Sequence, residues 1–185
     1  MGSDAPWHDA VDPADLRAVV AHDHIRMLAS RYAVAVDSRD LDTLVGLFVD
    51  DVQVGRERVG RDALRDDFEV SLRAVGVTIL QVGTHVIDLV DDRSATGVVY
   101  CSGQVEQNGR WIHQSIVYRD TYERRGRDWY FVRRVHELFH GVAAPTNPLA
   151  QEPADWPANA TGRGTAPGSF PTWERFWQGG AGPEG

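Results

Sequence analysis

The sequence predicts an α+β fold, in which helices come first along the chain and a run of antiparallel strands follows. Two observations support this prediction. The spacing of apolar residues is helical before Val77 and typical of long β segments after it. Four such segments then follow one another with only turn signals between them, which leaves no room for a crossover helix. We therefore expect a curved sheet that wraps over the helices.

The first half of the chain is expected to be mainly helical. Asp12 before Pro13 is a helix start signal, and Asp40 is a suitable cap for the next helix. The expected elements are one or two helices at residues 13–36, helices at 41–48 and 61–75, and a short strand at 52–59. The stripe of the first segment that should face the interior comprises Leu16, Val19, Val20, Ile25, Leu28, Ala29, Tyr32 and Val36.

The second half is expected to form four consecutive strands, at residues 77–90, 95–107, 110–124 and 128–139. Turn residues separate them at Asp91, at Asn108-Gly109 and near Gly126. Asn-Gly between two β segments is the strongest short-range signal for a hairpin. The four strands should therefore pair with one another in sequence order.

The chain has 185 residues and 42% apolar content, which fits one globular domain, placed at residues 1–144, and an extension at 145–185. The extension is rich in Pro and Gly, yet it contains five large aromatic residues, which are Trp156, Phe170, Trp173, Phe176 and Trp177. A solvated tail has little use for these residues, so parts of it should dock on the body or on a neighbouring subunit. The extension is then either a lid over the site or a segment packed on the surface.

The charge of the chain limits its partners. The formal net charge is −8 and no basic run occurs, so neither nucleic acid nor a membrane surface is an expected partner. No apolar stretch approaches the length of a membrane span, and the N-terminal residues lack the pattern of a signal peptide. We expect a cytoplasmic protein. The lone cysteine, Cys101, cannot form an internal disulfide and is expected in the core.

The residue types present also limit the chemistry. All nineteen basic residues are arginine, which excludes Schiff-base catalysis and lysine-anchored pyridoxal phosphate. No Walker lysine is present, and no G-x-G-x-x-G follows a strand. The segment "HELFH", from His136 to His140, matches a zinc motif only by letters, because in an extended strand the two histidines would lie about 13 Å apart. We expect no cofactor and no metal, and therefore acid–base chemistry.

Asp37 is the residue that the helical pattern explains least. At 100° per residue it lies at the border of the apolar stripe, just where the first helix should end. A carboxylate at this point meets the negative end of the helix dipole, so local energetics do not favour it. Asp37 is then either a turn residue whose side chain bonds nearby amides or a residue placed there for function.

Four stretches carry a resemblance to a known family. They are "IRMLASRYAVAVDSRDLDTLVGLFVDD", "GRDAL", "GTH" and "VYRDTYERRGRDWYF". In order and spacing they resemble the SnoaL-like branch of the NTF2-like superfamily, over residues 15–140. The resemblance implies a cone, with N-terminal helices packed in a strongly curved antiparallel sheet and a pocket between them. It also implies that Asp37 is a catalytic aspartate and that Tyr32 belongs to the site.

Members of this family pair the aspartate with a histidine on the first long strand, and the resemblance places Gln81 at that position. Gln81 and His85 are four residues apart and should share a face of the strand, so His85 is a possible substitute. His113 on a later strand is the other candidate. The expected substrate-binding residues are Gln81, Tyr100 and Trp111.

These residues suggest a proton-transfer site. A histidine can accept a proton at neutral pH, a buried carboxylate fixes its tautomer, and the Tyr32 hydroxyl could stabilise a developing enolate. We expect a cofactor-independent, dehydratase-like lyase or isomerase that acts on a hydrophobic carbonyl-bearing molecule such as a polyketide, steroid or terpenoid. Asp37 with His113 or His85 would move the proton.

Other functions remain open because the family hosts dehydratases, isomerases, cyclases, hydrolases and proteins without known activity. The first alternative is a non-catalytic module for small-molecule binding or assembly with the same fold. The others are a polyketide cyclase and an epoxide hydrolase, which would need an Asp-Arg-Asp set. Arg119 and Asp120 are available for that set, but they point to opposite faces of their strand. The resemblance also implies a homo-dimer or homo-trimer.

Overall fold

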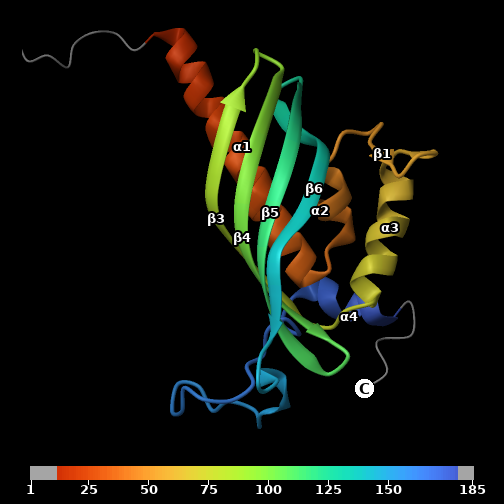
Figure 1. Ribbon diagram of the computed structural model, residues 1–185, viewed down its shortest axis with the longest axis vertical. Helices are drawn as coiled ribbons and strands as arrows, with labels where there is room; N and C mark the ends of the chain where they lie inside the picture. The colour runs from red at the N-terminus through yellow and green to blue at the C-terminus, as the bar shows by residue number, and fades with distance from the viewer. Residues whose placement is uncertain (1–11, 179–185) are drawn as a thin grey trace, which may run out of the picture.

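The computed structural model describes residues 12–178, so the N-terminal residues on which the leader expectation rests lie outside it. Its centre is a four-stranded antiparallel sheet in the order β3-β4-β5-β6, with α1 along one face (Figure 1). The helices are α1 (Pro13–Ser38), α2 (Leu41–Gly46), α3 (Arg61–Arg73), the 3₁₀ turn η1 (Pro148–Ala150) and α4 (Pro171–Gln178). The strands are β1 (Gln53–Val54), β2 (Arg58–Val59), β3 (Thr78–Leu89), β4 (Ser94–Gln107), β5 (Arg110–Arg125) and β6 (Asp128–Ala143).

The first expected segment is a single helix, α1. The Asp12 carboxylate caps it by accepting a hydrogen bond from the Ala14 amide at 2.7 Å. The expectation that the whole apolar stripe is buried is wrong for its first turns, where Leu16, Val19 and Val20 are 57%, 64% and 46% exposed. The reason is geometric, because these turns extend beyond the end of the sheet (Figure 1).

The segment after α2 also differs from expectation. Asp40 caps α2 as predicted, by accepting a hydrogen bond from the Thr43 amide at 3.0 Å. The single strand expected at 52–59 is instead a hairpin of two-residue strands, β1 and β2. Gly55, at φ 62°, makes the turn between them, since glycine adopts a positive φ at little cost.

The four long strands follow the predicted order and boundaries closely. Asn108 and Gly109 have φ values of 53° and 69°, which is the mirror-image turn that joins twisted strands. Irregularities interrupt the regular alternation of side chains, and one lies in β3 between Val82 and His85. This bulge changes which side chains of β3 face α1.

The core lies between α1 and the inner face of the sheet, which is the face turned toward α1. Its largest fully buried residues include Ile25 of α1, Val99 of β4, Tyr122 of β5 and Phe131 of β6. The Cys101 thiol is also buried on this face, as expected for a core residue, and burial raises its pKa to about 11. The interior of the sheet is therefore apolar apart from a few polar groups.

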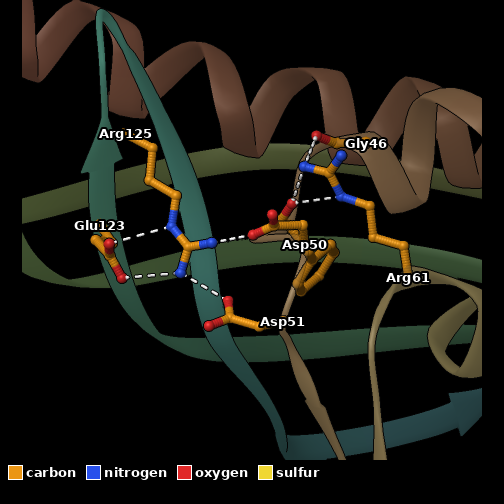
Figure 2. Close-up of polar contacts among 7 residues, drawn as sticks. Gly46, Asp50, Asp51, Arg61, Glu123 and Arg125 are labelled. Carbon is orange, nitrogen blue, oxygen red and sulfur yellow. Dashed lines mark hydrogen bonds and ion pairs between the residues drawn. The ribbon is translucent and has the colours of Figure 1, made fainter.

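Two arginines fix the segment around α2 and β1 to the rest of the fold (Figure 2). Arg125 at the end of β5 forms ion pairs with Asp50, Asp51 and Glu123; the two aspartates are exposed, and Arg125 and Glu123 are half-buried. Arg61 at the start of α3 donates from Nε to the Phe48 carbonyl at 2.9 Å. The ion pairs with the exposed aspartates contribute little to stability, so Arg61, which satisfies a carbonyl in the interior, is the stronger anchor.

Part of the C-terminal extension packs against the body. In α4, Phe176 is only 7% exposed and lies in a cluster with Val36, Leu44 and Leu72. The Thr172 hydroxyl donates to the Ser38 carbonyl at 2.7 Å, so α4 covers the C-terminal end of α1. Trp156, in contrast, is 76% exposed. Within residues 12–178, no helix has both the length and the apolar character needed to cross a bilayer.

Candidate functional site

A chain of hydrogen bonds crosses the inner face of the sheet. It begins at His85 of β3, whose Nε2 lies 3.0 Å from the Tyr122 hydroxyl. That hydroxyl donates to Asp120 Oδ2 at 2.8 Å. Asp120 in turn accepts two hydrogen bonds from Arg134 of β6, at 2.9 and 2.7 Å. Three neighbouring strands thus contribute to one connected polar group, which we call the His85 chain.

The direction of these hydrogen bonds fixes the tautomer of His85. The single hydroxyl proton of Tyr122 is given to Asp120, so the hydroxyl must accept from Nε2–H of His85. Burial, which outweighs the attraction of Asp120, lowers the pKa of His85 to about 4. The imidazole is therefore neutral at pH 7, and its Nδ1 carries a free lone pair. Nδ1 is buried and has no hydrogen-bond partner.

The ion pair at the end of the chain is deeply buried. The side chains of Asp120 and Arg134 are 0% and 4% exposed, and their two hydrogen bonds are parallel. The Arg134 guanidinium also lies over the rings of Tyr32, Tyr118 and Phe131, at 4.3 to 4.4 Å. This arrangement compensates both charges and holds the carboxylate in one orientation.

Gly97 of β4 makes space for the chain. A Cβ atom at this position would lie 3.0 Å from the Tyr122 hydroxyl and 3.0 Å from the Val86 carbonyl oxygen. The backbone oxygen cannot move freely, so a larger residue would displace Tyr122. Glycine at position 97 is therefore part of how the sequence positions the His85 chain.

Two tyrosines of the interior have free hydroxyls. Tyr32 of α1 and Tyr118 of β5 pack edge to face with ring centroids 5.9 Å apart. Neither hydroxyl forms a hydrogen bond with another described residue, while the Tyr118 side chain is buried and the Tyr32 side chain is half-buried. Burial is the main factor that raises the pKa of both tyrosines. Each therefore stays a hydrogen-bond donor at neutral pH.

Asp37 belongs to a second polar group, at the C-terminal end of α1. Its Oδ1 accepts from the Thr78 hydroxyl and its Oδ2 from the Leu80 amide, both at 2.9 Å. Arg39, which is 2% exposed, donates from Nη1 to the same Thr78 hydroxyl at 2.9 Å. Burial, the largest effect, raises the pKa of Asp37 to about 6 in spite of these hydrogen bonds.

The structure does not bring Asp37 and His85 together. Asp37 contacts the backbone of β3 at Leu80, and five residues of extended strand, about 16 Å, separate Leu80 from His85. Among the described residues, Asp37 forms no hydrogen bond with any histidine. β3 is an edge strand, so the Leu80 amide has no neighbouring strand to bond to on its free side. The Asp37 carboxylate accepts the hydrogen bond of this amide instead.

The remaining sequence-predicted residues lie on the outer face of the sheet, which is turned away from α1. Gln81 and Tyr100 are exposed there, and His113 is exposed on β5, where it pairs with Gln104 of β4. The expectation that Gln81 and His85 share a face is wrong, because the β3 bulge between them reverses the alternation.

Trp111 lies farther along the outer face, at the end of β5. It is 3% exposed, donates from Nε1 to the Gln104 side chain at 3.1 Å, and its carbonyl accepts from the Ala144 amide at 2.7 Å. The segment that follows β6 therefore packs around it. The structure places Trp111 and His113 on one face and the His85 chain on the other.

Sequence reasoning missed Tyr122 and Arg134, and it weighed Asp120 only for an epoxide hydrolase. A signal for them exists in the sequence. Tyr118, Asp120 and Tyr122 are two residues apart on β5, so their side chains point to the same face of the sheet. A carboxylate therefore lies between two inward-facing aromatic residues. A charge at such a position needs a buried partner, and arginines are present on the next strand.

The two histidines of "HELFH" lie in β6, as expected, and not on a helix. His136 packs on the Tyr118 ring with centroids 5.4 Å apart, and His140 Nε2 lies 3.4 Å from the Ser115 hydroxyl. Among residues 12–178, no group of three or more His, Cys, Asp or Glu side chains is arranged to hold a metal ion. A surface pocket of about 500 Å³ lies between α1, the end of α2 and the start of β6, near Arg31 and Tyr130.

Comparison with known proteins agrees with this architecture. The family model for the SnoaL-like domain matches residues 17–135. Solved structures with a similar fold include hexachlorocyclohexane dehydrochlorinase LinA, at 21% identity and a TM-score of 0.65 over 71% of this chain and 95% of that one. LinA type 3 from Novosphingobium barchaimii has 20% identity and a TM-score of 0.63 over 71% and 94%.

A candidate scytalone dehydratase from Novosphingobium aromaticivorans has 19% identity and a TM-score of 0.61 over 72% of this chain and 93% of that one. No curated protein matches the chain. At these identities the structural likeness establishes the fold, which is the α+β NTF2-like cone expected from the sequence. Because the family model covers most of the chain, the protein belongs to the family of SnoaL-like domains.

Proposed function

We propose that the protein is a cofactor-independent lyase or isomerase of dehydratase type. Its substrate would be a hydrophobic molecule with a carbonyl group, of the polyketide, steroid or terpenoid class. The observation that carries this proposal is His85, a neutral imidazole with a free Nδ1, bonded through Tyr122 to a buried Asp120–Arg134 pair. A base with this support in an apolar interior is suited to remove a proton from carbon.

In this proposal substrate entry displaces the side chains that cover His85 Nδ1, which is sealed from solvent in the free protein. Nδ1 then takes the proton next to the carbonyl group. The C–H bond electrons move toward the carbonyl oxygen and form an enolate, and the imidazole becomes positively charged. Nε2–H still donates to Tyr122, and the Asp120 charge favours the imidazolium. Asp120 would therefore act as a positioning and charge-stabilising residue and would not exchange the proton itself.

The enolate oxygen needs a hydrogen-bond donor. Tyr32 and Tyr118 carry free hydroxyls whose raised pKa values keep them protonated. The Arg134 guanidinium over both rings adds positive charge close to the developing anion. We assign the oxygen-binding role to Tyr32 first, with Tyr118 beside it.

Asp37 is too far from His85 to act on the same carbon atom or on its neighbour. With a pKa raised to about 6, a fraction of its carboxyl groups is protonated near neutral pH and can donate a hydrogen bond. We propose that Asp37 contacts a polar group at the far end of an elongated substrate. This role suits a polycyclic or chain-like molecule better than a small one.

A second function is supported by a specific observation. Both oxygens of Asp37 are already used, by Thr78 and by the free edge of β3. This fits a non-catalytic binding or assembly module in which Asp37 only completes the fold. An epoxide hydrolase that uses Arg119 and Asp120 has less support, because Arg119 pairs with Glu137 on the outer face and does not join Asp120.

The test is turnover of a panel of β-hydroxy ketones by three variants. His85→Gln removes the base, Asp37→Asn removes the acid at the far end, and His113→Ala is the matched histidine change on the outer face. Loss of the base should reduce kcat about 100-fold or more. His113→Ala should leave kcat unchanged, and Asp37→Asn should raise KM more than it lowers kcat.

Folding of each variant is checked by circular dichroism. If His113→Ala loses turnover and His85→Gln keeps it, the base is wrongly assigned. If the folded wild type binds members of the panel without converting any of them, the non-catalytic function is correct.

A further inference from the structure

The first turns of α1 carry apolar residues that the sheet does not cover. Leu16 and Val20 lie on turns that extend beyond the end of the sheet (Figure 1), and they are 57% and 46% exposed. They belong to one wall of a hollow at this end of the molecule. The other wall contains Leu89 at the end of β3 and Trp129 at the start of β6. An exposed apolar surface with polar residues around it is typical of a site that binds a ligand.

This hollow, here called the α1 groove, has a volume of about 390 Å³. Its apolar lining comprises five residues of α1 between Ala14 and Ala21, together with Leu89 and Trp129. Trp129 is 5% exposed and belongs to the main core cluster, so part of the lining is fixed by the packed interior. No residue of the His85 chain lines the α1 groove, and Leu89 is four residues beyond His85 along β3, about 13 Å away. The groove is therefore separate from the candidate site described above.

Three arginines also line the α1 groove. Arg17 comes from α1, and Arg124 and Arg127 flank the turn between β5 and β6. Within residues 12–178, none of these three guanidinium groups forms an ion pair with a carboxylate. A guanidinium group without such a partner can bind an anion through two parallel hydrogen bonds.

Two carboxylates line the groove as well, and one of them is already used. Asp91 Oδ1 accepts hydrogen bonds from the amides of Arg93 and Ser94, both at 2.7 Å, and so closes the turn between β3 and β4. Asp92 is the other carboxylate. The groove thus has three positive and two negative side chains, in a chain whose net charge is −8. This local excess of positive charge favours an anion over a cation.

We propose that the α1 groove binds a small amphipathic anion, which is an apolar molecule that carries one carboxylate. Its apolar part packs against Leu16, Val20 and Trp129. Its carboxylate accepts hydrogen bonds from Arg124 and Arg127. This binding site does not depend on the function proposed for His85.

The size of the groove favours a small molecule as the occupant. Its volume of about 390 Å³ lies within the range of about 300–1,000 Å³ that is typical of small-molecule sites. A specific protein interface takes about 20–30 residues on each side, whereas thirteen residues line the groove. An anionic membrane surface would be repelled by the net negative charge of the molecule.

The experiment measures binding of octanoate to the full chain by isothermal titration calorimetry at about 0.15 M NaCl, where long-range charge effects are screened. Octylammonium has the same chain with the opposite charge, and acetate has the charge without the chain. Octanoate should bind at least about 10-fold more tightly than either of them. Equal affinity for octanoate and octylammonium, or for octanoate and acetate, overturns the proposal.

Two sets of variants locate the bound octanoate. Val20→Asp places a negative charge in the groove and should weaken binding at least about 10-fold. Val19→Asp is its matched control, because Val19 is the neighbouring residue, is 64% exposed and does not line the groove. Arg124→Gln and Arg127→Gln should each weaken binding about fivefold or more. Arg56→Gln, in the exposed turn between β1 and β2, should leave binding unchanged.

Circular dichroism confirms that each variant is folded, and Val20→Ser replaces Val20→Asp if the latter does not fold. A wild type that does not bind octanoate, or groove variants that bind it as tightly as the wild type, overturns the proposal. Loss of binding in His85→Gln alone would place octanoate in the interior and would also overturn it. Flotation with phosphatidylglycerol vesicles tests the other occupant, and a wild type that floats without binding octanoate would assign the groove to a membrane surface.

Discussion

Asp120 and Arg134 form a two-point ion pair in the interior, with side chains that are 0% and 4% exposed. One residue earlier on β5, Arg119 pairs with Glu137 on the outer face, where the side chains are 61% and 48% exposed. The two pairs have the same chemistry and opposite environments. This contrast allows the structural role of the buried pair to be measured directly.

Asp120→Asn should destabilise the fold by about 3–5 kcal/mol, because it leaves the Arg134 charge buried without compensation. Glu137→Gln should change the free energy of unfolding by less than about 1 kcal/mol, since exposed pairs contribute little. Urea denaturation of both variants measures the two values. Equal effects in the two variants would contradict the assignment of a deeply buried pair.

His85 should make the protein less stable in mild acid. Its pKa is lowered to about 4 from the usual 6.5, so the folded state favours the neutral imidazole. The associated stability is complete above pH 6.5 and is lost as the pH falls toward 4. After allowance for partial exposure of the ring, the loss should be about 1–2 kcal/mol.

The comparison is between the wild type and His85→Gln, whose amide can still donate to Tyr122. The difference in unfolding free energy between them should change over pH 6.5 to 4. A difference that stays constant over this range would show that His85 titrates normally and is not held neutral.

Asp37 should have the opposite effect on pH dependence. Its pKa is raised to about 6 from 3.8, so the folded state favours the protonated carboxyl group. That stability is fully present below pH 3.8 and is lost as the pH rises through 6. Relative to Asp37→Asn, the wild type should become less stable by about 1–2 kcal/mol between pH 4 and 7.

Chemical denaturation of His85→Gln and Asp37→Asn at several pH values separates the two residues. Their contributions to the unfolding free energy change with pH in opposite directions. Titration of the Asp37 carboxyl carbon by NMR gives an independent value. A midpoint near 4 would mean that Thr78, Leu80 and Arg39 outweigh the effect of burial.

The packing of α4 against the body should depend on the Phe176 side chain. Phe176→Ala should cost about 3–4 kcal/mol, because the ring fills a cluster with Val36, Leu44 and Leu72 and lies 4.5 Å under the Arg73 guanidinium. Trp156→Ala, in the same extension, should have almost no effect, since Trp156 is 76% exposed. Thermal unfolding of both variants tests this, and a larger effect of Trp156→Ala would contradict the observed packing.

Much of the fold could be predicted because its signals are local. The cap at Asp40, the Asn108-Gly109 turn and the apolar alternation of four strands each depend on a few neighbouring residues. The sequence predicts one strand where the structure has the hairpin at 53–59, because Gly55 lies inside a short stretch with β character. Local signals do not determine the pairing of such short segments.

The site was harder to predict because it depends on bulges and on contacts between distant residues. The bulge between Val82 and His85 moves His85 to the inner face and leaves Gln81 on the outer face. No residue type in that stretch predicts the bulge. Arg134 and Asp120 are fourteen residues apart and meet only through strand register. The partners of Asp37 on β3 likewise follow from tertiary packing alone.

The proposed function requires His85 to remove a proton from the carbon next to a carbonyl group. Exchange of that proton for deuterium, followed by proton NMR in D₂O with a panel of β-hydroxy ketones, tests it independently of the later steps. Exchange is expected with the wild type and with His113→Ala, and its rate should be reduced about 100-fold or more with folded His85→Gln. Exchange at the wild-type rate in His85→Gln, or no exchange in a wild type that binds the ketones, would show that His85 is not the base.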